Sequence, residues 1–424
     1  MKNMLPTVIF VVVLLAIDLY AFKSLKLVTS DWQKLFLKNS ILIAYWIASA
    51  VAYGLIIYAI SVFNSSGLQR ADYYIFFMGF AVLLVILIPK LIISLFHLFD
   101  DIIHLLRSIS GYFIQTKNPG ESITNNGITR WQFLSRTGWV LAALPFISIL
   151  YGVASGRFNF RILKNTLSFS NLPKSADGLR IVHISDIHIG SFFKDFKSVK
   201  PGLDKINDLK PDLILFTGDM INNYAEELDG WVPYLSALKA KYGKYSILGN
   251  HDYGDYVNWP SSEAKAENLQ QLKNGHEEMG FHLLLNEKAE IETAPGESFE
   301  LLGVENWGLG GFSKHGDLEK AMSNSNSEKF QILMSHDPSH WNAQVTGKTK
   351  IDLTLSGHTH GMQFGIEIPG LVKWSPAKYR YKHWGGLYSE NDQFIYVNRG
   401  FGYIGFPGRI GMSPEITVID LKKS

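Results

Sequence analysis

Four long apolar stretches dominate the first 156 residues of the chain. Three of them contain no charged residue, at positions 39–69, 73–89 and 137–156. The first stretch, positions 3–22, contains a single charge, Asp18. About 20 apolar residues are needed to cross a hydrocarbon core of ~30 Å. Each of the four stretches approaches or exceeds that length, provided that the third is counted with the apolar residues that follow Lys90. The pattern predicts four transmembrane helices, over residues 4–22, 41–63, 73–96 and 138–155.

Polar residues in this region give few signs of function. Asp18 lies near the end of its stretch, so we expect its carboxylate to reach the membrane interface rather than to mark an ion pathway.

The segment 100–136 is polar and contains the turn signal Lys117–Gly120, which predicts a loop with an interfacial helix near 102–113. The spans hold few charges and no obvious pair of ionisable residues, which disfavours a transporter. A signal peptide is the alternative for the first stretch, but a clear small-residue cleavage site is lacking.

Beyond residue 156 the pattern changes to short apolar runs that alternate with amphipathic stretches. Five runs are three to five residues long, β-rich and followed by Gly, Ser or Asn, at 180–184, 213–217, 245–248, 330–334 and 353–355. Helices are predicted over 198–209, 230–240 and 262–279, and later strands over 281–285, 299–304, 394–398 and 415–421. This alternation predicts an α/β domain with a layered mixed sheet. The expected domains are a membrane domain over 1–156, a linker over 157–177 and a catalytic domain over 178–424.

Each of the five short runs is followed by a polar motif. The motifs are Ser185–His188, Thr217–Asp219, Gly249–Asp252, Ser335–Pro338 and Ser356–His360. Ligands of α/β proteins bind at the carboxyl ends of strands, so we expect these motifs to meet. In Asp186–His188 and in His358–His360 the outer residues point to one side of an extended chain, because side chains alternate. Two such pairs and a bridging carboxylate suffice for two metals ~3.5–4 Å apart that hold the attacking and leaving oxygens of a displacement.

Composition narrows the chemistry. The chain has no cysteine, which excludes disulfides, thiolate metal sites and a cysteine nucleophile. The donors in the motifs are His, Asp and Asn, which suit Mn, Fe or Zn better than Ca or Cu(I). Lys and Arg total 40 against 38 for Asp and Glu, so the formal net charge of +2 argues against a nucleic-acid partner and a nuclease.

The order of these motifs resembles the calcineurin-like metallophosphoesterase superfamily over about residues 178–424. The closing stretches Asn398–Gly402 and Gly408–Ile416 resemble its membrane-anchored or exported bacterial phosphodiesterase branch. The resemblance implies a two-sheet sandwich flanked by helices, with a dinuclear centre of two divalent ions. The implied ligands are Asp186, His188 and His360 for the first ion, Asn250, His336 and His358 for the second, and Asp219 as the bridge between them.

The same resemblance implies the catalytic groups. A metal-bound hydroxide is the expected nucleophile, without a covalent enzyme intermediate. His251 is expected to touch the phosphate or to protonate the leaving oxygen. Asp252 is expected to orient His251 or its loop, with a simple turn-forming role as the alternative.

These observations predict an integral-membrane, metal-dependent phosphoesterase that cleaves phosphomonoesters or phosphodiesters. Its location favours a lipid-linked phosphate ester as substrate and membrane lipid as a partner, while the oligomeric state cannot be read. One alternative is a cytoplasm-facing pyrophosphohydrolase of a nucleotide-linked lipid precursor. The other is a non-catalytic membrane sensor or transporter with a phosphoesterase-like domain. Five aromatic residues in Gly-rich loops form either an apolar rim or ordinary packing: Trp307, Trp374, Trp384, Phe401 and Phe406.

Positive residues around the predicted spans indicate an orientation. The side shared by the N-terminus and the catalytic domain carries five, namely Lys2, Arg70, Arg157, Arg161 and Lys164. The other side carries eight, namely Lys23, Lys26, Lys34, Lys38, Arg107, Lys117, Arg130 and Arg136. Since positive residues favour the cytoplasm, the catalytic domain is expected outside, in the periplasm of a two-membrane bacterium. The segment Thr129–Ser135 resembles a twin-arginine export signal with Trp131 in place of the second arginine, and it points the same way.

Overall fold

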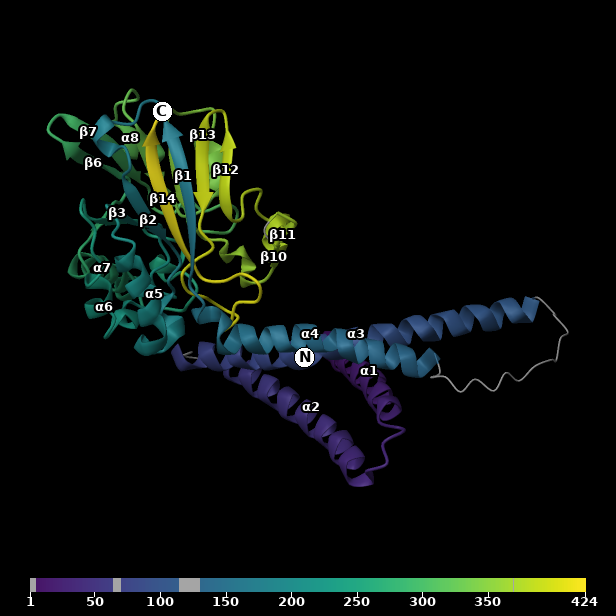
Figure 1. The fold of residues 1–424 in the computed structure, drawn as a ribbon. Coiled ribbons are helices and arrows are strands. Elements are labelled where there is room, and N and C mark those ends of the chain that lie inside the picture. The colour runs from purple at the N-terminus through teal and green to yellow at the C-terminus, as the bar shows by residue number, and fades with distance from the viewer. Residues whose placement is uncertain (1–4, 64–69, 114–129, 369) are drawn as a thin grey trace. The chain divides into compact units, whose positions relative to one another are not determined.

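The computed structural model describes residues 5–63, 70–113, 130–368 and 370–424. It contains two compact units, Met1–Leu150 and Tyr151–Ser424. Figure 1 draws the helices of the first unit in purple and blue and the strands and helices of the second in teal to yellow. The first unit is helical, and the second combines strands with helices.

The first unit contains the helices α1 (Leu5–Val28), α2 (Leu35–Phe63), α3 (Arg70–Phe113) and most of α4 (Arg130–Ala154). Within the described residues, three segments are long and apolar enough to cross a membrane: Leu35–Val62, Ile75–Ser110 and Arg130–Ala154. They correspond to the second, third and fourth predicted spans. The helix α1 covers the first predicted span and is not one of these three.

The segment 100–136, which the sequence predicts as a loop, is helical at both ends. The helix α3 continues to Phe113 and α4 begins at Arg130, so the predicted interfacial helix is the end of α3. Charged residues interrupt the apolar run here, but apolar residues at helical spacing continue beyond Asp101. At 1.5 Å per residue the 44 residues of α3 extend about 66 Å, well beyond a ~30 Å core. Residues 114–129, with the predicted turn Lys117–Gly120, lie outside the described residues.

Asp18 does not reach an interface, contrary to the expectation from its place in the sequence. Its side chain is fully buried in the first unit and forms an ion pair with Lys90 of α3. The Tyr45 hydroxyl of α2 donates to Asp18 Oδ1 over 2.9 Å. A second ion pair joins Asp100 to Arg130. The expectation of no paired ionisable residues is therefore wrong, because the partners lie 72 and 30 positions apart and only the fold brings them together.

The second unit is a sandwich of two six-stranded sheets (Figure 1). The first sheet has the order β1-β14-β2-β3-β4-β5, formed by Arg161–Phe169, Glu415–Lys423, Arg180–Ile184, Leu213–Phe216, Lys244–Ser246 and Phe281–Leu283. The second has the order β12-β13-β9-β8-β7-β6, formed by Gly386–Glu390, Gln393–Val397, Leu353–Ser356, Gln331–Met334, Glu297–Gly303 and Glu287–Ala294. A separate hairpin joins β10 (Ile366–Ile368) to β11 (Val372–Trp374). The helices are α5 (Phe196–Asp208), α6 (Val232–Ser236), α7 (Ser262–Glu278) and α8 (Leu318–Met322).

Side-chain alternation along the strands divides the core of this unit into layers. Ile181 of β2 and Leu215 of β3 point between the sheets, where they join Leu301 of β7 and Ile332 of β8. Their neighbours in the same strands point the other way, into a second layer that α5, α6 and α7 cover. The predicted sandwich flanked by helices is therefore confirmed, and its strand ends form a rigid support for the loops that follow them.

The strand β1 lies in the segment 157–177, which the sequence predicts as a linker. It pairs in parallel with β14 along its whole length. It is an edge strand, and only Leu167 and Phe169 of it are buried in the core between the sheets. A strand with so few buried positions leaves a weak apolar pattern, which is why the sequence does not reveal it.

Candidate metal centre

The motifs that follow β2, β3, β4, β8 and β9 meet at the carboxyl ends of these strands. Two groups of side chains have ligand atoms that all lie within 4.8 Å of one another: Asp186, His188 and His360, and Asp219, His336 and His358. The seventh predicted ligand, Asn250, adjoins the second group, with its Oδ1 3.2 Å from His336 Nε2. The fold thus brings all seven predicted ligands together in two adjoining sets.

Asp219 lies between the two groups. Its Oδ2 is 3.5 Å from His188 Nε2 of the first group and 3.2 Å from His336 Nε2 of the second. Within the first group, His360 Nε2 lies 3.1 Å from His188 Nε2 and 3.2 Å from Asp186 Oδ1. A metal bound at ~2.0–2.2 Å holds its ligand atoms roughly 3 Å apart, so these spacings suit one cation in each group with Asp219 shared.

Hydrogen bonds on the far side of two rings determine which nitrogen faces the centre. His336 Nδ1 donates to the carbonyl of Thr217 over 2.7 Å, so Nε2 is the nitrogen that would offer a lone pair to a metal. The Tyr381 hydroxyl lies 2.9 Å from His358 Nε2, which leaves Nδ1 of that ring as the possible ligand atom. Contacts of this kind hold metal-binding imidazoles in one tautomer and one orientation.

Burial and neighbouring charges set the protonation of the donors. Burial alone raises the pKa of the Asp219 carboxyl, but the adjacent histidines, His336 foremost, hold it well below its usual range. For Asp186, burial also raises the pKa, and His360 together with His336 more than reverses that effect. Burial lowers the pKa of His358 to about 4, so its imidazole is neutral near pH 7. Ionised carboxylates beside a neutral imidazole are the donor state that a divalent metal requires.

His336 differs from the other ligands in its protonation. Burial lowers its pKa, but Asp219 and Asp186 more than reverse this and raise the pKa to about 10. In the protein alone, a proton on His336 therefore balances part of the negative charge of the two buried carboxylates. A divalent metal would supply that positive charge and displace the proton. The donor set fits a pair of divalent ions on this ground.

Five predicted ligands have left-handed backbone conformations, which residues with a side chain avoid at ~1–2 kcal/mol each. They are Asp186, His188, Asp219, His358 and His360, with φ between 47° and 72°. They follow β2, β3 and β9, where the chain turns sharply as it leaves the sheets. Such conformations persist only where the surrounding structure imposes them, and they concentrate at functional sites. These turns aim the donors inward.

Gly357 lies between β9 and His358 without room for a side chain. A Cβ there would overlap Ser185 Oγ and Asp186 Oδ2. Gly357→Ala is therefore expected to displace Asp186 and to lower metal affinity and activity by ~10–100-fold. Gly54→Ala, in α2 with nothing within 4 Å of the added carbon, is the matched control and should change neither. Metal content and phosphoester hydrolysis of the purified variants check this, and a wild-type metal content in Gly357→Ala would contradict it.

Asp252 is buried below the loops that carry the donors. Its carboxylate accepts four backbone hydrogen bonds of 2.8 to 3.2 Å, from the N–H groups of Asp219, Met220, Ile221 and Gly249. These bonds tie the loop after β3 to the loop after β4. Asp252 thereby holds together the loops that carry Asp219 and Asn250, and its role in catalysis stays a prediction.

Several side chains around the second group are not predicted from the sequence. Asn250 Nδ2 donates to the Tyr256 hydroxyl over 2.8 Å, which turns Asn250 Oδ1 toward His336. The Phe312 ring packs edge-on against His358, with 4.7 Å between ring centroids. Phe312 and Tyr381 come from loops without a strand-end motif, and Tyr256 lies four residues beyond the motif Gly249–Asp252, so no local pattern singles them out.

Arg409 is a fourth unpredicted neighbour and is fully buried. Its Nη2 donates to the carbonyl of Arg399 over 2.8 Å and lies 3.3 Å from His360 Nδ1. Burial lowers the pKa of Arg409 to about 9. The only sequence signal for it is its place in the closing stretch Gly408–Ile416, which resembles the membrane-anchored branch of the family.

The aromatic residues considered as a rim are mostly packing residues. Phe401 is buried and stacks on Phe160 with 4.5 Å between centroids. Trp384 is buried as well, and Trp307 stacks on His340 at 4.9 Å. Their contacts are within the catalytic unit.

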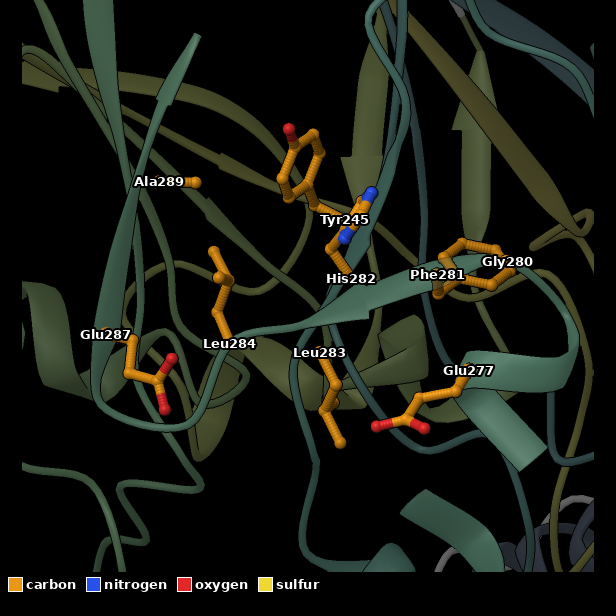
Figure 2. Close-up of a pocket in the computed structure, with 9 residues that line it drawn as sticks. All are labelled: Tyr245, Glu277, Gly280, Phe281, His282, Leu283, Leu284, Glu287 and Ala289. Carbon is orange, nitrogen blue, oxygen red and sulfur yellow. The ribbon is translucent and has the colours of Figure 1, made fainter. Parts of the chain in front are cut away.

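A cavity of about 630 Å³ lies apart from the donors. Figure 2 shows that it is lined by residues near β5 and β6, among them Tyr245, His282, Leu284 and Glu287. None of the seven ligands lines it. The candidate chemistry therefore belongs to the strand ends and not to this cavity.

Two groups of oxygen and nitrogen donors that share one carboxylate, on turns at the strand ends of a two-sheet sandwich, define a metal-dependent phosphoester hydrolase. The sequence matches the calcineurin-like phosphoesterase family over residues 179–362. Residues 2–157 match the transmembrane domain of a probable calcineurin-like phosphoesterase with four membrane spans. The chain therefore belongs to the calcineurin-like metallophosphoesterase family, and it is an integral membrane protein.

Curated relatives agree with this assignment. The chain is 34% identical over 265 residues to YkuE of Bacillus subtilis, an uncharacterized metallophosphoesterase, covering 62% of this chain and 85% of that protein. It is 30% identical to a transmembrane protein with a metallophosphoesterase domain from Danio rerio, covering 65% and 60%. It is also 30% identical to LpxG of Chlamydia muridarum, a UDP-2,3-diacylglucosamine pyrophosphatase, covering 62% and 90%.

Proposed function

We propose that this protein hydrolyses the phosphoester bond of a lipid-linked substrate at a dinuclear metal centre. The observation that carries the proposal is the position of Asp219 Oδ2, within 3.5 Å of a histidine nitrogen from each donor group. One carboxylate oxygen shared between two donor groups is the arrangement that holds two ions close enough to act on one phosphate. Membrane helices in the same chain support a substrate that resides in lipid.

Seven residues would hold the two ions. Asp186, His188 and His360 would bind the first, Asn250, His336 and His358 the second, and Asp219 both. When bound, such a pair supplies Lewis acidity toward the phosphate oxygens and lowers the pKa of water. The donors suit Mn, Fe or Zn, and Asn250 contributes a neutral oxygen that keeps the negative charge of the ligand set low.

His251 is in position to move a proton. Its ring Nδ1 donates to the carbonyl of Asn222 over 2.8 Å, and its backbone N–H donates to Asp219 Oδ1 over 2.8 Å. Because Nδ1 is occupied, Nε2 is the atom left to act on a leaving oxygen. Burial lowers the pKa of His251, so Nε2 can deliver a proton there only from the protonated ring, which the charge of a bound phosphate would favour. The ring lies 4.9 Å from that of His188 and is only partly buried, so a substrate at the donors can reach it.

The leaving group has two candidate classes. The first candidate is a simple lipid phosphoester. The second, which the similarity to LpxG favours, is a pyrophosphate bond in a nucleotide-linked lipid. A non-catalytic sensor would have no need to keep a complete donor set on strained turns. Turnover measured on lipid monoesters, diesters and pyrophosphates by the detergent-purified protein separates these classes.

Metal removal is expected to abolish hydrolysis. A chelator strips the ions and leaves the buried carboxylates to be balanced by protein groups such as the proton on His336, which cannot activate water. Re-addition of Mn²⁺, Fe²⁺ or Zn²⁺ should restore turnover of bis-p-nitrophenyl phosphate. Metal content determined by mass spectrometry, in parallel with rates, checks the prediction. Full turnover by protein verified to be metal-free would disprove the proposed function.

We also propose that the catalytic unit faces the outside of the cell membrane. The support is the number of positive residues, five on the side of the catalytic unit and eight on the other side of the membrane. Two of these residues, Lys2 and Lys117, lie outside the described residues. Protease added to intact spheroplasts should then digest the catalytic unit, with a cytoplasmic marker protein left whole as the control. Digestion that requires lysis would reverse this orientation.

A further inference from the structure

The hairpin formed by β10 and β11 begins six residues after the predicted ligand His360. Figure 1 shows it as a small element outside the two large sheets. Its register pairs Ile366 with Trp374 and Ile368 with Val372. Residues paired across two strands share a face, so one face of this hairpin is entirely apolar.

Most of that apolar face is exposed, although Trp374 at its base is half-buried. Ile366, Ile368 and Val372 are exposed, and Leu371 beside them is 79% exposed. Phe364, which leads into β10, is exposed as well. Contiguous apolar surface of this kind is unfavourable in water and marks an interaction surface.

The polar face of the hairpin is held against the catalytic unit. Glu367 forms an ion pair of 2.6 Å with the buried Arg399. Lys373, its cross-strand partner, donates to the carbonyl of Gly385 and lies over the ring of Trp384. These polar contacts therefore keep the apolar face turned outward. In a protein surrounded by water the apolar face of a strand pair usually packs on the core and the polar face is exposed.

Short contacts connect the base of the hairpin to a membrane-spanning helix. Gly365 N–H donates to the carbonyl of Ile410 over 2.9 Å, and Phe364 forms a β-bridge with the same residue. The neighbouring Arg409 N–H donates to the carbonyl of Gly152 over 3.1 Å. Gly152 lies in the last turn of α4, inside the candidate span Arg130–Ala154. All of these residues belong to one compact unit.

We propose that the apolar face of β10–β11 is embedded in the lipid bilayer beside the metal centre. The occupant of the face is hydrocarbon, because two backbone contacts separate the hairpin from the end of a transmembrane helix. The consequence for the substrate rests on the proposed function. If the enzyme hydrolyses a lipid-linked phosphoester, the phosphate of that lipid reaches the donors while its acyl chains stay in the bilayer. Lys378 and Arg380, exposed after β11, suit anionic headgroups at the same level.

The absence of cysteine allows a direct test on the full chain. Leu371→Cys is labelled with an environment-sensitive fluorophore, and the protein is placed in nanodiscs of phosphatidylethanolamine and phosphatidylglycerol with or without brominated acyl chains. We expect brominated chains to at least halve the emission. Pro295→Cys, in the turn between β6 and β7 at the opposite edge of the second sheet, is the control and should show no change.

A second measurement separates lipid contact from catalysis. The double variant Ile368→Ser and Leu371→Ser loses two apolar contacts with lipid, so its KM for p-nitrophenyl hexadecyl phosphate in nanodiscs should rise roughly tenfold or more. Its kcat/KM for soluble bis-p-nitrophenyl phosphate should stay unchanged. Leu387→Ser, an exposed apolar residue of β12, is the matched control and should alter neither value.

The outcomes distinguish the inference from the function on which it rests. Equal emission in both kinds of nanodisc would overturn lipid embedding, whatever the enzyme hydrolyses. Unquenched label in particles that contain two copies of the chain would also overturn it and assign the face to a dimer contact. Quenched label in a protein that hydrolyses neither probe would support the embedded hairpin and count against the proposed function.

Discussion

Asp219→Asn is expected to remove most of the bound metal and to reduce phosphoester hydrolysis by at least ~10³-fold, more than the ~10–100-fold typical for a residue that only orients a ligand. Asp219 Oδ2 lies near His188 and His336 of the two donor groups, so its charge would serve both cations. An amide in its place carries no charge and withdraws that attraction from both ions. Metal per chain and turnover of bis-p-nitrophenyl phosphate measure the effect.

Two other aspartates serve as comparisons. Asp204→Asn, at an exposed position of α5 paired with Lys200, should leave metal content and rate unchanged. Asp252→Asn should retain more metal than Asp219→Asn but lower the melting temperature, because an amide cannot accept all four backbone bonds that Asp252 accepts. Equal losses of metal and rate in the variants of Asp219 and Asp252 would contradict the bridging role.

His251→Ala is expected to keep its metal and to lose ~10²–10⁴-fold in rate, the usual contribution of a positioned general acid. The reason is that Nδ1 of the ring donates to the carbonyl of Asn222, so Nε2 is the nitrogen left to carry a proton to the leaving oxygen when the ring is protonated. The loss should be smaller for a p-nitrophenyl leaving group, which departs without a proton, than for an alkyl alcohol. Rates on both ester types, with metal content measured alongside, check the prediction.

His282→Ala provides the control for this histidine, since His282 is exposed on β5. It should change neither rate nor metal content. If His251→Ala loses metal, His251 is a ligand rather than a proton donor. If both ester types lose the same factor, its role is to bind the phosphate instead of protonating the leaving oxygen.

The central strands of the catalytic unit could be predicted because they are buried on both faces. The run predicted at 180–184 is β2, with the same bounds, and the run at 353–355 falls within β9. A strand buried on both faces is a continuous apolar run, which the sequence displays directly. Helix bounds were close for α5 and α7, while the predicted helix 230–240 is only Val232–Ser236 in the structure.

Edge elements could not be predicted in this way. In β6 only Ile291 is buried, no residue of β12 is buried, and β10–β11 places its apolar residues outside. The pattern of a half-exposed strand resembles that of a loop when its polar positions are irregular. The ion pair between Asp18 and Lys90 was missed for another reason, because it depends on a contact between helices and not on either helix alone.

The candidate site was predictable to the extent that donors follow strands. The five strand-end motifs contain all seven residues that the fold brings together. The residues that orient those donors were not predictable, because Tyr381 and Arg409 approach from distant loops as single polar groups. A single tyrosine or arginine has no spacing by which to recognise it.

The ion pair between α1 and α3 has a consequence for the biogenesis of the protein. Asp18 is synthesised 72 positions before Lys90, and a lone charge in the middle of a span disfavours insertion by about 2.5–3.5 kcal/mol. Tyr45 of α2 can donate to Asp18 earlier, but the charge is neutralised only when α3 brings Lys90 beside it. We expect α1 to remain beside the insertion machinery until α3 emerges from the ribosome, so that the two helices enter the lipid together. A nascent chain that stops before Lys90 would then be an unassembled membrane fragment and a substrate for quality-control proteases.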